Sequence, residues 1–352
     1  MFGIWRTSLA LEVVVSHLLF VPILGGYAVF SFFVLSGFLM TSIMQKTYGY
    51  SAAGFVAYAQ NRALRLYPNY WFAIIVSLAV IWSVGEAITT RHFASLSVPQ
   101  NTAEWLQNLT IIFPYFVPSD ARSILAPPTW ALTVELCFYV IIGLGASRAK
   151  RTTLYWFLAS VSYLIVVRYF YSGNRYSYAA IAAGSLPFSV GALTYHYLAD
   201  IRAMLVRCRI ADARLLIGAR WIVFALALLL LWKADWYAAT MVALWINIGL
   251  SSLIICALAT LEAPKSLRHI DKAIGDYSYP VYLLHMQMAV VASVLLFGER
   301  MPKLRSAEGV AVLAITLLLT GVLATFCARV IDPAVERRRT RIRARVVAAS
   351  AV

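Results

Sequence analysis

Charged residues are scarce in this chain. Asp, Glu, Lys and Arg make up 13% of its 352 residues, whereas soluble domains carry about 25%. Hydrophobic residues reach 62%, and the mean hydropathy is +0.77. This small amount of charge cannot cover a surface that faces water. The composition therefore excludes secreted soluble, fibrous and disordered proteins, and it predicts an integral membrane protein.

Paired cysteines are also missing. The four cysteines stand alone, three of them within apolar runs, and none forms a CxxC pair. This pattern predicts neither a disulfide framework nor a zinc site, and we expect no metal. Because internal repeats and low-complexity linkers are absent too, we expect one transmembrane domain over residues 1–335, followed by a basic cytoplasmic tail over 336–352.

Long apolar runs are abundant. A bilayer core about 30 Å thick needs about 20 mostly apolar residues per helix, and that length divides the chain into about ten spans of an all-α membrane protein. Their approximate bounds are 4–23, 28–45, 69–88, 129–146, 153–171, 177–199, 217–232, 236–260, 278–297 and 309–330. The apolar stretch 101–118 is short and contains Pro and Asn, so we expect it to lie at the interface or to re-enter the membrane.

Basic residues orient this arrangement. With both termini in the cytoplasm, the cytoplasmic loops and ends collect 22 of the 30 Lys and Arg, Arg220 among them, as the positive-inside rule requires. The tail sequence ERRRTRIRAR (336–345) is typical of a topology anchor beside anionic lipid rather than a nucleic-acid site, so no nucleic-acid partner is expected.

Ionisable residues within apolar spans are candidates for function because burial in lipid is costly. In the first span, Arg6 and His17 are eleven steps apart, about 16 Å along a helix and within about 20° of the same face. Glu12 points elsewhere and is not expected to pair with His17. A membrane histidine is either a hydrogen-bonding link between helices or a chemical group, and spacing does not separate the two.

The next two segments are GGYAVFSFFVLSGFLM (25–40) and NRALRLYPNYW (61–71). Gly37 suggests close helix packing, and Ser36 suggests a hydrogen bond to a backbone carbonyl. Arg62 and Arg65 lie one turn apart just before the expected third span. They are either a positive-inside anchor or a clamp for phosphate, which arginine forks bind bidentately.

Two later segments carry the remaining candidates. PPTWALTVELCFYV (127–140) places Glu135 within the membrane, close to Trp130, Thr133 and Tyr139, and predicts a hydrogen-bonded carboxylate. IGDYSYPVYLLHMQM (274–288) brings four polar side chains into the ninth span: Ser278, Tyr279, Tyr282 and His285. His285 is either a second participant in chemistry or a packed hydrogen-bonding group.

These five segments, in this order, resemble the acyltransferase-3 family of bacterial polytopic membrane proteins, which transfer acyl groups to carbohydrates and other acceptors. The resemblance rests on RTSLALEVVVSH (6–17), FFVLSGF (32–38), RALRLYP (62–68), TWALTVELCFY (129–139) and GDYSYPVYLLH (275–285). Two features depart from the family: no Asp-Gly pair precedes Arg6, and Phe30 and Ser31 stand where an acidic residue often precedes the Phe pair.

The resemblance implies a multi-pass inner-membrane O-acyltransferase that moves an acyl group, commonly acetyl, from cytoplasmic acyl-CoA to a carbohydrate or glycolipid hydroxyl. His17 and Arg6 match the family's essential histidine and its paired arginine, and we add Glu135 as a third catalytic candidate. Arg62 and Arg65 are candidates for binding the acyl-CoA, and the substrate and supporting candidates are Ser36, Trp130, Tyr139, Ser278, Tyr279, Tyr282 and His285. The main alternative is a transporter or flippase, since buried His, Glu and Arg also mark transport pathways.

Overall fold

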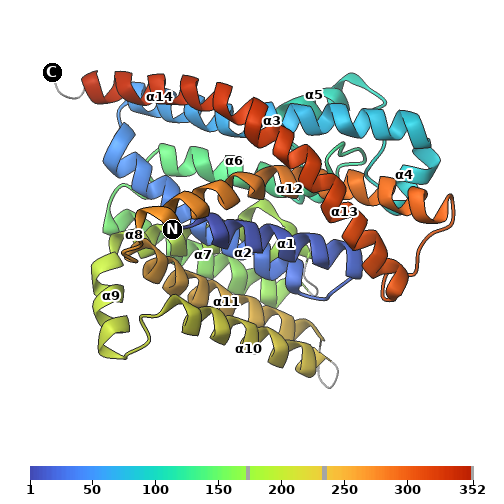
Figure 1. The fold of residues 1–352 in the computed structure, drawn as a ribbon. Coiled ribbons are helices and arrows are strands. Elements are labelled where there is room, and N and C mark those ends of the chain that lie inside the picture. Colours follow the sequence, from blue (N-terminus) through green and yellow to red (C-terminus); the bar gives the residue numbers. More distant parts are fainter. Residues whose placement is uncertain (172–174, 232–235, 350–352) are drawn as a thin grey trace.

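The computed structural model describes residues 1–171, 175–231 and 236–349, and all regular structure within these ranges is helical (Figure 1). The α-helices are α1 (Gly3–Leu19), α2 (Leu24–Ile43), α3 (Ala52–Val84), α4 (Glu86–His92), α5 (Thr102–Thr110), α6 (Trp130–Gly143), α7 (Lys150–Phe170), α8 (Ser185–His196), α9 (Leu198–Arg207), α10 (Ala213–Leu231), α11 (Trp236–Ala259), α12 (Lys265–Phe297), α13 (Ala307–Phe326) and α14 (Asp332–Ala349). Short 3-10 and π turns connect several of them.

Every range expected to span the membrane contains a helix, and the all-helical fold is confirmed. In the described part of the chain, seven helical stretches are long and apolar enough to cross a bilayer: Leu24–Tyr48, Ala52–Val84, Lys150–Phe170, Ala213–Leu231, Thr240–Ala259, Lys265–Phe297 and Ala307–Val346. The expected first, fourth and sixth spans are the shorter helices α1, α6 and α8, of 17, 14 and 12 residues. The count of ten spans and the cytoplasmic side of both termini stay predictions.

Two expected boundaries are wrong. Helix α3 begins at Ala52 rather than near 69, and α12 begins at Lys265 rather than near 278. Pro68 and Pro280 lie inside these helices, although an interior proline removes one backbone hydrogen bond. Since both helices continue beyond their apolar stretches, hydropathy alone located only their apolar halves, and Arg62 and Arg65 lie within α3 rather than before it.

Helices α1 and α12 run side by side in the same direction at the centre of the bundle. The Asp271 carboxylate on α12 accepts hydrogen bonds from the backbone N–H groups of Gly3 and Ile4, both at 3.0 Å. It thereby satisfies two of the four N–H groups that the start of a helix leaves unpaired. One turn further on, a Cβ at Gly275 would lie 2.5 Å from the Gly3 Cα, so this crossing requires glycine.

Helices α2 and α8 cross equally closely. A Cβ at Gly37 would collide with the Phe188 carbonyl oxygen, and a Cβ at Gly191 would collide with that of Val34. The prediction that Gly37 permits close packing is confirmed. This crossing brings α2 into the interior, with Ser36 directly before Gly37 in the chain.

The segment between α4 and α6 is not a span, in agreement with expectation. It consists of α5 and an irregular stretch over 111–129 that places several apolar side chains in the interior. Arg122 in the irregular stretch binds the first turn of α5, because its guanidinium donates to both carboxylate oxygens of Glu104 at 3.0 and 2.6 Å. Hydrogen bonding from Arg122, and then from the Gln100 N–H, holds the pKa of Glu104 below its usual value.

Candidate active site

A cavity of about 840 Å³, which includes its open mouth, lies among α1, α2, α3, α6 and α12. It gathers segments of the chain as far apart as residues 6 and 282. Its polar lining residues are Arg6, Ser36, Arg62, Arg65, Glu135, Tyr139, Ser278, Tyr279 and Tyr282. The remaining wall is apolar and comes mainly from α2 and α6, through Val29, Phe32, Phe33, Leu35, Leu39, Met40, Leu66, Ala131 and Leu132.

Three arginines at this cavity have no acidic or hydrogen-bonding partner in the described part of the protein. Arg6 projects from α1 past Gly275, where a Cβ would lie 2.9 Å from its Nη2. Arg62 and Arg65 project from successive turns of α3. None of the three forms an ion pair or donates a side-chain hydrogen bond there, and the Nε atoms of Arg6 and Arg62 are buried and unpaired. Buried donors without partners are costly, so this cluster is suited to an anionic ligand.

The Glu135 carboxylate lies in the same cavity and is oriented by two hydroxyl groups. Ser36 on α2 donates to Oε1 at 2.5 Å, and Tyr139, one turn along α6, donates to the same oxygen. No described residue donates to Oε2. The predicted hydrogen-bonded carboxylate is therefore present, although Thr133 donates elsewhere, to the Ile111 carbonyl, and Ser36 binds the carboxylate rather than a carbonyl.

His17 and His285 form a pair beyond this cavity. The Nδ1 of His17 lies 2.9 Å from the Nε2 of His285, and the two rings are parallel within 6°. Arg6 and His17 both reach α12, which confirms that they share one face of α1. Neither histidine lines the cavity.

Backbone carbonyls determine which nitrogen carries each proton when both rings are neutral. His285 Nδ1 lies 2.9 Å from the Tyr282 carbonyl oxygen and 3.3 Å from that of Val281. Carbonyl oxygens only accept, so His285 Nδ1 carries the proton and its Nε2 accepts from His17 Nδ1. His17 Nε2 then keeps its lone pair and can act as a base.

The Tyr282 ring links the cavity to the histidine pair. Tyr282 and Phe32 both line the cavity, and their ring centres are 6.3 Å apart. The Tyr282 ring centre is also 6.4 Å from that of His285. Its hydroxyl donates to the Pro128 carbonyl at 2.6 Å, which anchors the ring to the irregular segment before α6.

The other predicted residues have diverse surroundings. Tyr279 donates to the Leu66 carbonyl, and the Arg65 guanidinium lies 5.9 Å from its ring centre. Ser278 donates to the Gly275 carbonyl within its own helix. Trp130 does not line the cavity and packs edge-on against Tyr178.

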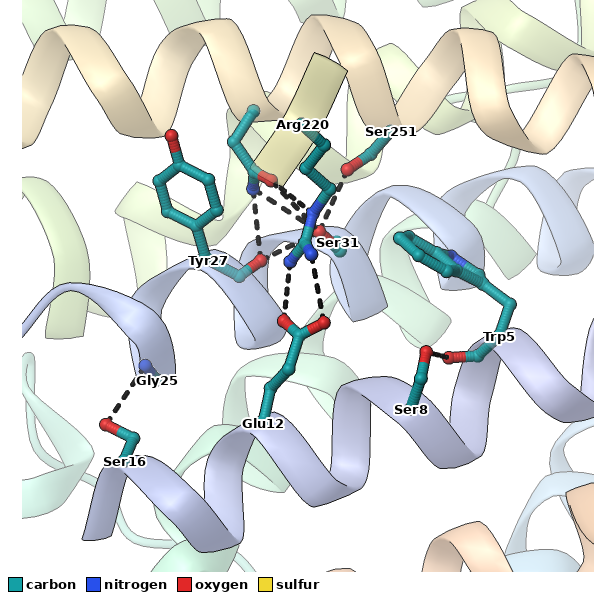
Figure 2. A network of polar contacts seen from close by, with 10 residues as sticks. Trp5, Ser8, Glu12, Ser16, Gly25, Tyr27, Ser31, Arg220 and Ser251 are labelled. Carbon is teal, nitrogen blue, oxygen red and sulfur yellow. Dashed lines mark hydrogen bonds and ion pairs between the residues drawn. The ribbon is translucent and has the colours of Figure 1, made fainter. Parts of the chain in front are cut away.

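Glu12 belongs to a separate polar network, as its angular position on α1 predicted (Figure 2). Arg220 on α10 is fully buried and donates to both Glu12 oxygens at 2.9 and 2.7 Å and to Asn247 Oδ1 at 2.8 Å. Its guanidinium also lies 5.2 Å from the Trp5 ring centre. Assigning Arg220 to a cytoplasmic loop was therefore wrong, because α10 begins at Ala213 and carries it into the bundle.

Sequence reasoning missed this partnership. The available signal was Arg220 itself, since it is followed by an unbroken apolar run that a helix would continue. Asn247 is a polar residue in the middle of another such run. Neither residue lines the cavity among α1, α2, α3, α6 and α12.

No group of three or more His, Cys, Asp or Glu side chains positioned to hold a metal occurs among the residues that the structure describes.

Comparison with known proteins identifies the family. The sequence model of the acyltransferase-3 family, described as an acyltransferase domain, matches residues 2–328. No similar protein was found among curated proteins or solved structures. The match contains α1 to α13 and every candidate residue named above, and the chain belongs to the acyltransferase-3 family of membrane acyltransferases.

Proposed function

We propose that this protein is an inner-membrane O-acyltransferase that moves an acetyl group from cytoplasmic acetyl-CoA to a hydroxyl of a carbohydrate or glycolipid. The observation that carries the proposal is the set of three arginines, none with an acidic or hydrogen-bonding partner in the described structure, at a cavity that also has an apolar wall from α2 and α6. That combination suits a ligand with phosphates at one end and an uncharged acyl thioester at the other.

The donor binds through its phosphates. Arg62 and Arg65 form charge-assisted hydrogen bonds to the pyrophosphate, and Arg6 contributes from the opposite wall. Phe33 and Leu132 contact the uncharged arm that carries the thioester. Since phosphate binding leaves the reacting carbon unchanged, this part of the site acts mainly on the affinity for the donor.

His17 serves as general base. Its Nε2 removes the proton from the acceptor hydroxyl as that oxygen attacks the thioester carbonyl carbon, which forms a tetrahedral intermediate. The carbon–sulfur bond then breaks, and the departing sulfur takes the proton back from His17, so the products are the acyl ester and free CoA. His285 supports this role by accepting from Nδ1, which keeps the lone pair on Nε2.

Glu135 and the Tyr282 ring complete the site. The free Oε2 of Glu135 accepts a hydrogen bond from a hydroxyl or amide group of a bound substrate, while Ser36 and Tyr139 fix its direction. Because His17 does not line the cavity and the Tyr282 ring lies between the cavity wall and His285, that ring must turn aside when the thioester and the base meet. Trp130 and Ser278 support the walls on either side, and membrane lipid surrounds the whole.

The test follows a labelled acyl group. Membrane vesicles from the native host, which contain the natural acceptor, are supplied with acetyl-CoA labelled in the acetyl group, and both free CoA thiol and labelled glycan are measured. The wild-type protein should release thiol and label the glycan, and His17→Ala should lower both rates at least about 100-fold, since general-base help is worth about 10²–10⁴-fold.

His269→Ala is the matched control, because His269 is exposed on α12 and its side chain makes no hydrogen bond in the described structure. This variant should keep the wild-type rate. Full activity of His17→Ala in folded protein would remove His17 from the mechanism, and vesicles that contain abundant protein but transfer no label would overturn the proposed activity.

A further inference from the structure

A second cavity lies directly outside the first. It holds about 1560 Å³ and shares Arg6, Arg62 and Arg65 with the inner cavity, so the two meet at these arginines. Its other lining residues come from the start of α12 and from α14 and the turn before it: Lys272, Asp276, Ala328, Asp332, Pro333, Val335, Glu336, Arg337, Arg339, Thr340 and Arg341. Helix α14 lies outside the family match, which ends at residue 328.

Helix α14 is fastened to α3 by side-chain hydrogen bonds and lies along it (Figure 1). The fully buried Asn61 donates to the Arg339 carbonyl at 3.1 Å and accepts from Arg339 Nε at 2.7 Å. Two turns further along α3, Asn69 donates to Asp332 at 2.9 Å. A tail that only lay on the lipid surface would need neither the Asn61–Arg339 nor the Asn69–Asp332 hydrogen bonds. These contacts therefore hold α14 in a defined position over the mouth of the site.

The positive charge of the outer cavity is only partly neutralised. Asp276 lies 3.8 Å from Lys272, and Glu336 pairs with Arg339 at 2.7 Å. Arg337 and Arg341, one turn apart on the same face of α14, form no ion pair in the described structure. Both are exposed, with their terminal guanidinium nitrogens free to bind a ligand.

We propose that α14 supplies a second phosphate subsite, in which Arg337 and Arg341 bind the 3′-phosphate of coenzyme A. This inference rests on the proposed function. Two groups of guanidinium groups without ion pairs in the described structure flank one continuous path that ends in a cavity with an apolar wall. Coenzyme A has two separate phosphate centres followed by an uncharged thioester arm. The inner arginines take the pyrophosphate and the outer pair takes the 3′-phosphate.

Charge placement favours this ligand over a lipid headgroup. Arg337 and Arg341 line a cavity that continues into the acyl site, whereas Arg338 and Arg345 on the same helix do not line it. If α14 served only as a membrane anchor, all four of these arginines would contribute alike to the attraction to anionic lipid. The subsite therefore predicts that these two pairs of arginines differ in function.

The experiment measures binding by calorimetry, with full-length protein in detergent and two probes, coenzyme A and 3′-dephospho-coenzyme A. The wild-type protein should bind coenzyme A at least about tenfold more tightly, a difference of about 1.4 kcal/mol. In Arg337→Gln/Arg341→Gln the two probes should bind equally, with the affinity for 3′-dephospho-coenzyme A unchanged. The charge-retaining variant Arg337→Lys/Arg341→Lys should recover part of the preference.

Arg338→Gln/Arg345→Gln is the matched control, since it removes the same charge from the same helix and should keep the wild-type preference. An equal loss of affinity for both probes in the Arg337/Arg341 variant, or the same loss in the control, would overturn the subsite and assign the effect to general charge. Unchanged coenzyme A binding in a folded Arg337/Arg341 variant would refute it and leave the proposed function standing. Failure of the wild-type protein to bind either probe would instead refute the proposed donor, and the subsite with it.

Discussion

The ion pair between Glu12 and Arg220 gives the sharpest test of how this bundle is held together. It joins α1 to α10 through two charge-assisted hydrogen bonds, with the guanidinium fully buried and the carboxylate side chain only 7% exposed. Removing one partner from such a pair leaves an uncompensated buried charge and costs about 3–5 kcal/mol. Arg220→Met and Glu12→Leu should each lower the free energy of unfolding by that amount.

The double variant should behave differently. Replacing a whole buried ion pair with apolar residues of similar volume is often neutral or stabilising, so Glu12→Leu/Arg220→Met should lie within about 1 kcal/mol of the wild type. Asn247 loses its bond to Arg220 Nε but keeps the one it donates to the Tyr27 carbonyl at 3.0 Å, which limits the residual cost to about 1 kcal/mol.

The assay is a double-mutant cycle on purified protein, with unfolding followed by circular dichroism as SDS replaces a mild detergent. Strong non-additivity supports the reasoning, because the two single losses then describe the same broken pair. Additive losses, with the double variant about 6–10 kcal/mol less stable than the wild type, would contradict it. Acyl transfer in the double variant should persist, since neither residue lines the cavity among α1, α2, α3, α6 and α12.

Two further predictions concern the active site. Arg62→Gln should raise the KM for acetyl-CoA about tenfold with little change in kcat, because phosphate contacts bind the donor without acting on the reacting carbon; initial-rate kinetics decide this, and an unchanged KM would return Arg62 to the role of a membrane anchor. Tyr139→Phe should lower kcat about 10–100-fold, because a hydrogen bond to a charged group is worth about 1.5–3 kcal/mol and Glu135 then keeps only the bond from Ser36. The same kinetics test this second prediction, and a wild-type kcat would show that the direction of the Glu135 carboxylate is unimportant.

The sequence predicted most of the residues of the candidate site, but not the residues on other helices that hydrogen-bond to them. Arg6 and His17 could be placed on one face because the helix repeat fixes their angle, and Arg62 and Arg65 because they are neighbours one turn apart. Ser36, which donates to Glu135, and His285, which pairs with His17, lie on other helices, at separations of 99 and 268 residues. Helical periodicity describes one helix at a time, so it could not identify them.

The sequence by itself determined that this is a helical membrane protein of the acyltransferase-3 type, since composition, apolar runs and local motifs are properties of short stretches of chain. Only the tertiary structure decided that the three arginines and Glu135 share one cavity, that His17 meets His285, and that Arg220 is an interior residue. It also decided that helix α14 lines the outer cavity that leads to the site. The physical reason is the same in each case: buried polar groups must find partners, and which helices supply them depends on how the helices pack.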